Sequence, residues 1–174
     1  MTITHSENRI YPSYNLLLLI AFLSGFVSLA YEIVATKVLY YFFNESTITA
    51  SSVISIFLFG IGLGSFIFSK FEKKISDKKK FIFAAQLLIA LYAAFIFPNY
   101  DLVPSFFNLL YPLFGESVSI LLIEKIIISL FHLIFPTVLM GMVFPAIIVI
   151  SIDKIEQLPE KIGVIYSFDV FGAV

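Results

Sequence analysis

The chain alternates between long apolar runs and short polar segments, and this spacing predicts helices that cross a membrane. A spanning helix needs about 20 predominantly apolar residues, with a range of roughly 17–25. Four runs reach this range, at residues 16–41, 48–68, 81–97 and 118–152, and a fifth begins at residue 162 and continues to residue 174. The predicted fold is therefore all-α: a polytopic helical membrane protein with four transmembrane helices plus the start of a fifth.

Positive charge is distributed unevenly between the segments that join these runs. The two loops at residues 42–47 and 98–117 contain no Lys or Arg, whereas six lysines lie between the second and third runs: Lys70, Lys73, Lys74, Lys78, Lys79 and Lys80. Loops rich in Lys and Arg stay on the cytoplasmic side. We therefore expect a multi-pass protein of the cell inner or plasma membrane, with residues 1–15 as a cytoplasmic N-terminal tail.

Composition excludes several classes of protein. Hydrophobic residues make up 60% of the 174 residues and charged residues 13%, about half the charged share of a typical soluble domain. This low charge content argues against a soluble globular enzyme, and the lipid bilayer is the expected partner. A net charge of −1 gives no surface for nucleic acid, and zero cysteines with two histidines leave no expected metal site.

Ionisable side chains within a span are costly and are by default functional candidates. In the first run Glu32 follows Tyr31, and Lys37 lies five residues further on, about 140° around the helix. Glu32 and Lys37 therefore do not share a face. Lys37 lies near the end of the run, where its side chain can extend to water or contribute to a site. Two interpretations of Glu32 stay open: an interhelical hydrogen bond, or a contact with a polar cavity or ligand.

Two further candidates lie in the later runs. His132 has only apolar neighbours in the fourth run, which is typical of a hydrogen bond between helices, with a ligand contact as the alternative. Asp169 lies in the fifth run, whose surroundings the sequence does not define. The predicted intramembrane polar site comprises Tyr31, Glu32, Lys37, His132 and Asp169.

Glycine and proline mark positions of helix packing and bending. Gly60 and Gly64 form a G-x-x-x-G pattern inside the second run, which permits close helix contact; a nucleotide-binding turn is the weaker interpretation because no strand precedes it. Gly141 offers a similar small surface. Pro136 and Pro145 should kink the fourth run because proline removes a backbone donor.

Several segments together resemble the N-terminal transmembrane domain of membrane-bound spermidine synthase-like proteins, which are polyamine aminopropyltransferases. The resemblance extends in the same order over nearly the whole chain. It departs where Ala35 replaces a usual Trp, Lys37 a usual Arg and Asp169 a usual Asn. The matching segments are 24–26 with 31–37, 59–65, 135–141 with 144–145, and 162–163 with Tyr166, Gly172 and Ala173.

The resemblance implies that this chain corresponds to only the membrane domain of a larger enzyme. Family members carry a Rossmann-like domain after the spans that binds decarboxylated S-adenosylmethionine and a diamine. This sequence contains no such domain, so we expect no catalytic residue and no cofactor here, and we expect the chain to be a fragment, a split-gene product or a truncation.

Three functional hypotheses follow. The first is a membrane domain that anchors or feeds a cytoplasmic aminopropyltransferase domain or partner chain, with Glu32 assisting a cationic polyamine. The second is a small transporter or channel subunit for a cationic or other small solute, working as a homo-oligomer. The third is a structural membrane protein.

Overall fold

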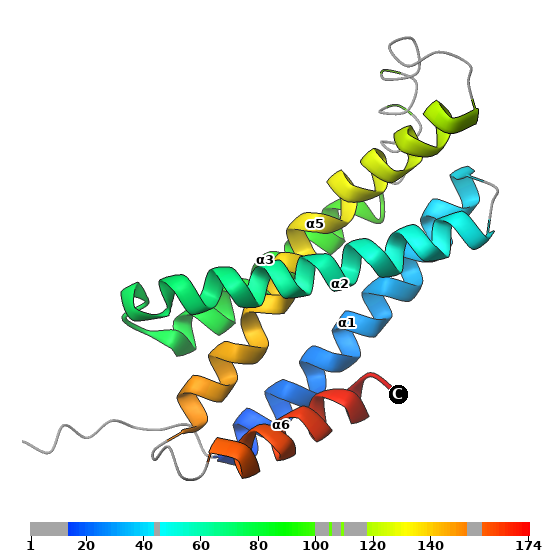
Figure 1. Cartoon of the computed structure of the whole chain (residues 1–174). Helices are drawn as coiled ribbons and strands as arrows, with labels where there is room; N and C mark the ends of the chain where they lie inside the picture. The colour runs from blue at the N-terminus through cyan, green and yellow to red at the C-terminus, as the bar shows by residue number, and fades with distance from the viewer. Residues whose placement is uncertain (1–13, 44–45, 100–104, 106–108, 110–117, 153–157) are drawn as a thin grey trace, which may run out of the picture.

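The computed structural model describes residues 14–43, 46–99, 105, 109, 118–152 and 158–174. This part of the chain is helical and contains no strand, which confirms the predicted all-α fold (Figure 1). The elements are α1 (Tyr14–Phe43), α2 (Ser46–Phe71), the short 3-10 helix η1 (Glu72–Lys74), α3 (Lys78–Ile96), α5 (Val118–Ser151) and α6 (Leu158–Gly172).

Four of these helices contain stretches long and apolar enough to cross a membrane, at Tyr14–Tyr41, Thr47–Lys74, Lys78–Ile96 and Lys125–Ser151. The chain is therefore a membrane protein by the length and composition of its helices. The fifth helix, α6, has 15 residues. It would extend about 22 Å, less than the roughly 30 Å hydrocarbon core of a bilayer.

The helix ends are sorted so that most of the lysines lie together. The starts of α1, α3 and α6 and the ends of α2 and α5 all lie toward the left of Figure 1. Lys161 of α6 joins three of these ends, because its Nζ donates to the carbonyl of Ser151 and lies 5.8 Å from the ring centroid of Tyr14. We call this end, with the lysines between residues 70 and 80, the lysine end.

Helix α2 packs most extensively against α5, and glycines bring the two backbones together. A Cβ placed at Gly64 would lie 2.1 Å from the carbonyl oxygen of Val138, and one at Gly141 would lie 2.3 Å from that of Ile61. Gly60 faces the side chain of Thr137 in the same crossing. Any side chain at these glycines would force the helices apart.

Helix α6 packs mainly against α1, again through glycines. A Cβ at Gly25 would lie 1.9 Å from the carbonyl oxygen of Asp169, and one at Gly172 would lie 1.9 Å from that of Phe22. The bundle therefore contains two tightly crossed helix pairs, α2/α5 and α1/α6.

The two prolines of α5 each leave one backbone carbonyl without an intrahelical donor. A helical carbonyl accepts from the N–H four residues later, so Pro136 frees the carbonyl of His132 and Pro145 frees that of Gly141. The Tyr92 hydroxyl of α3 donates to the His132 carbonyl at 3.0 Å, and the Ser65 hydroxyl of α2 donates to the Gly141 carbonyl at 2.8 Å. Side chains of neighbouring helices thus replace both missing donors.

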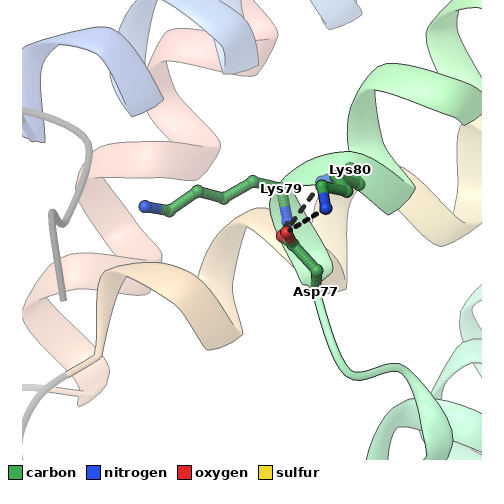
Figure 2. A network of polar contacts seen from close by, with 3 residues as sticks. All are labelled: Asp77, Lys79 and Lys80. Atoms are coloured by element: carbon green, nitrogen blue, oxygen red, sulfur yellow. Dashed lines mark hydrogen bonds and ion pairs between the residues drawn. The ribbon is translucent and has the colours of Figure 1, made fainter. Parts of the chain in front are cut away.

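Helix α3 starts with three lysines, which interact unfavourably with the positive end of the helix dipole. Asp77 counters them as the N-cap: its Oδ1 accepts from the backbone N–H groups of Lys79 at 3.1 Å and Lys80 at 3.2 Å (Figure 2). The bond from Lys80, with that from Lys79 and the charge of Lys80, holds the pKa of the Asp77 carboxyl below its ordinary 3.8. The cap stabilises the start of α3.

Candidate intramembrane binding cavity

A cavity of about 330 Å³ lies where the two helix pairs meet, lined by α1, α2, α5 and α6. Along the helix axes, the cavity lies between two groups of buried apolar side chains. One group lies nearer the lysine end and includes Leu17, Phe68 and Ile147; the other lies nearer the opposite end and includes Leu39, Val53 and Leu133. The cavity is therefore near mid-depth in the bundle.

The α1 wall is a polar stripe. Ser24, Ser28 and Glu32 line the cavity, and their spacing of four residues places them on one face of the helix. Ser24 is buried, and its hydroxyl accepts a hydrogen bond from Gln86 Nε2 of α3 at 3.3 Å. Sequence analysis singled out Glu32 and missed the two serines, although the repeat of four was present in the sequence.

The α6 wall adds a second carboxylate. Tyr166 and Asp169 of this helix, with Ala173 just after it, line the cavity. The fold therefore brings Asp169 and Glu32 together from distant parts of the chain. Both residues are half-buried. Among the residues that the structure describes, neither carboxylate has a hydrogen-bond or ion-pair partner.

The opposite wall is largely apolar. It is formed by side chains of α2 and α5, and the ring of Phe144 meets that of Tyr166 edge to face, with centroids 6.2 Å apart and an interplanar angle of 80°. The polar exception is Ser65, whose hydroxyl proton is used in the bond to the Gly141 carbonyl. The apolar members of this wall are Phe57, Leu58, Ile61, Met140 and Phe144.

The other predicted polar residues do not line the cavity. Tyr31 is buried with its ring 5.2 Å from that of Phe97, and Lys37 is exposed further along α1. The Tyr31 hydroxyl and the His132 Nε2 are both buried without a hydrogen-bond partner in the described part of the chain. The structure therefore joins two of the five predicted site residues, Glu32 and Asp169, and separates them from the other three.

The glycines and prolines singled out in the sequence lie around the cavity rather than in it. Gly60, Gly64 and Gly141 form the α2/α5 crossing, and the carbonyl freed by Pro145 is bonded by a cavity residue, Ser65. These positions set the distance between the walls.

The chemistry of the lining favours a small cation. An unpaired carboxylate in a low-dielectric interior requires a counter-charge or water, and this cavity holds two. Its volume lies at the lower end of the range of about 300–1,000 Å³ found for small-molecule pockets. Within the described residues no group of three or more His, Cys, Asp or Glu side chains could hold a metal ion.

Comparison with known proteins gives no relative on which to base a function. No protein-family model, curated protein or solved structure matches the chain. The resemblance to spermidine synthase-like membrane domains therefore rests on short segments of the sequence alone.

Proposed function

We propose that this chain is an integral membrane domain that binds a small organic cation in the cavity between α1, α2, α5 and α6. The observation that carries the proposal is that Glu32 and Asp169 line one cavity and that neither carboxylate has a partner in the segments that the structure describes. A bound ammonium group would supply the missing counter-charge and remove the cost of holding two carboxylates in a nonpolar environment.

The motif resemblance extends this proposal to a role in polyamine metabolism. In that role the domain anchors a cytoplasmic aminopropyltransferase domain, or a partner chain that carries one, and supplies it with an amine. Decarboxylated S-adenosylmethionine would bind to that enzyme domain and not to this chain. The cluster of lysines at one end of the bundle supports placing this end in the cytoplasm.

A direct binding experiment tests the proposal. Purified protein in nanodiscs should bind radiolabelled putrescine, which carries two ammonium groups, and the uncharged 1,4-butanediol should not compete. Glu32→Gln and Asp169→Asn should each weaken binding at least about tenfold, equivalent to about 1.4 kcal/mol. Glu160→Gln is the matched control, because Glu160 is an exposed carboxylate of α6 outside the cavity. Equal affinities in all four proteins would contradict the proposal.

Transport of the cation is a second candidate function, favoured by the mid-depth position of the cavity and the proline-interrupted helix α5 beside it. Proteoliposomes that contain the protein should then accumulate labelled putrescine, and Glu32→Gln should abolish the accumulation. Binding without accumulation would reject transport and retain the first proposal. Accumulation unaffected by Glu32→Gln would remove Glu32 from the pathway.

The proposed orientation has its own test, which the absence of native cysteine makes simple. Cysteines introduced at Lys74 and Ser105 should react with a membrane-impermeant maleimide from opposite sides of a sealed vesicle. Labelling of both from the same side would show that the predicted number of crossings between them is wrong.

A further inference from the structure

We infer that the cavity selects amphiphilic organic cations, in which an ammonium group carries an apolar substituent, over compact ones. This inference rests on the proposed cation-binding function and names the ligand class for the same cavity. The basis is the division of the lining into a charged side and an apolar side.

The charged side belongs to one helix pair. Glu32 of α1 and Asp169 of α6 line the cavity, and the crossing at Gly25 and Gly172 holds their backbones in contact. The two carboxylates therefore form a preassembled anionic wall, which fixes where the ammonium group of a ligand would lie.

The apolar side belongs mainly to the other pair. Phe57, Met140 and Phe144 present hydrocarbon, thioether and aromatic surface, and Tyr166 meets Phe144 at the seam between the pairs. A ligand without an apolar part would leave this wall without van der Waals contacts, whereas an apolar substituent would pack against it.

The mouth of the cavity favours the same class. Leu58 is 66% exposed and Tyr166 is 58% exposed, and both lie well inside their helices. Side chains exposed at mid-helix face the side of the bundle, so the cavity opens toward the hydrocarbon of the bilayer rather than toward bulk water. Amphiphilic cations concentrate at membranes, and they can reach this lateral opening from the lipid phase.

Competition against bound radiolabelled benzyltrimethylammonium in nanodiscs tests the inference, with empty nanodiscs subtracted to remove partition into lipid. Benzyltrimethylammonium should bind at least about tenfold more tightly than tetramethylammonium. Phe144→Ala and Tyr166→Ala should reduce this preference at least about threefold. Tyr166→Phe should retain it because the ring remains, and Phe171→Ala is the control, since Phe171 is a 70% exposed ring of α6 outside the cavity.

The possible outcomes separate the two proposals. If no cation binds more tightly to the wild type than to Glu32→Gln, both the proposed function and the ligand class are wrong. If cations bind in a Glu32-dependent manner but benzyltrimethylammonium has no advantage, the ligand class is overturned and the cation-binding function stands. An advantage that Tyr166→Phe loses as fully as Tyr166→Ala would also overturn the aromatic contribution.

Discussion

Glycines hold both helix pairs together, but the two pairs differ in whether their polar groups have partners. In α2/α5 the glycines close the crossing, and the side chain of Ser65 is used to satisfy the backbone of α5. In α1/α6 glycines again allow the backbones to touch, yet Glu32 and Asp169 beside this crossing have no hydrogen-bond or ion-pair partner among the residues that the structure describes. In the first pair a side chain of one helix bonds the free backbone carbonyl of the other. In the second pair two carboxylates have no counter-charge within the described part of the chain.

This difference shows how a small membrane protein combines rigidity with a polar site. In a bilayer, helix association depends on close van der Waals contact and on hydrogen bonds between helices. The α2/α5 pair has both and forms the scaffold. The α1/α6 pair relies on the glycine contact for its packing, so its polar side chains remain free to face the cavity.

The largest expected effect comes from breaking the scaffold crossing. Gly64→Ala places a Cβ 2.1 Å from the Val138 carbonyl oxygen, so the helices must separate, at a cost of about 1–3 kcal/mol. The matched control is Gly62→Ala on the same helix, where a Cβ would meet nothing within 4 Å. Because alanine favours helix, that change should stabilise the protein by about 0.5–1 kcal/mol. Reversible unfolding in mixed micelles measures the free energy of unfolding of both variants. Similar changes in the two would reject the scaffold role of the α2/α5 crossing.

The equivalent change in the other pair should act more locally. Gly25→Ala directs a Cβ at the Asp169 carbonyl oxygen, and because α6 packs mainly on α1, the displacement should be confined to α6. We expect a loss of about 1–2 kcal/mol, faster amide exchange in α6 and weaker cation binding. Amide exchange in α2 and α5 serves as the internal control. Equal acceleration throughout the bundle would show that the pairs are not separate units.

We expect a smaller loss of stability when the hydroxyl groups that replace the missing proline donors are removed. Ser65→Ala and Tyr92→Phe should each cost about 1 kcal/mol because a buried carbonyl loses its donor. In a Pro145→Ala background the restored N–H can bond the Gly141 carbonyl, so Ser65→Ala should cost less there. Tyr92→Phe in that background is the control and should retain its full effect, since it serves the other proline. A double-mutant cycle that gives no coupling between Ser65 and Pro145 would contradict this account.

We expect the smallest change in stability outside both helix pairs, at the N-cap of α3. The pKa of Asp77 is lowered in the folded protein, so its contribution to stability is complete above the ordinary value of 3.8 and is lost as the pH falls through the lowered pKa. The protection factors of the Lys79 and Lys80 amides, which correct for the slower intrinsic exchange at low pH, should fall over that range. Asp77→Asn keeps a capping oxygen without a charge that titrates, and it should show little pH dependence there. An unchanged pH profile in this variant would assign the effect to another group.

Much of the fold was predictable because its signals are local. The length of each apolar run defines a helix that can cross a bilayer, and the all-α prediction needed no information about contacts. The glycine pattern at residues 60 and 64 also indicated a packing face, and Gly141, named separately, proved to lie across from it. The polar stripe of Ser24, Ser28 and Glu32 was visible at helical spacing, although sequence analysis did not use it.

The candidate site was only partly predictable, since which polar groups meet depends on how the helices cross. Five polar residues were predicted as one intramembrane site, yet the structure places Glu32 and Asp169 in the cavity and Tyr31, Lys37 and His132 elsewhere. The prolines indicated that two carbonyls of α5 lose their donors. That Tyr92 and Ser65 supply the replacements follows only from the positions of α3 and α2.

The sequence by itself determined the apolar helices, their lysine-rich connection and the presence of a few costly polar groups within the spans. These are properties of single segments, governed by the transfer of side chains and backbone between water and hydrocarbon. The tertiary structure decided that α6 returns along α1 and brings Asp169 to the same cavity as Glu32. Burial and periodicity assign a residue to the interior of a helix bundle, but only the glycine-controlled crossing of two helices determines which carboxylates share that interior.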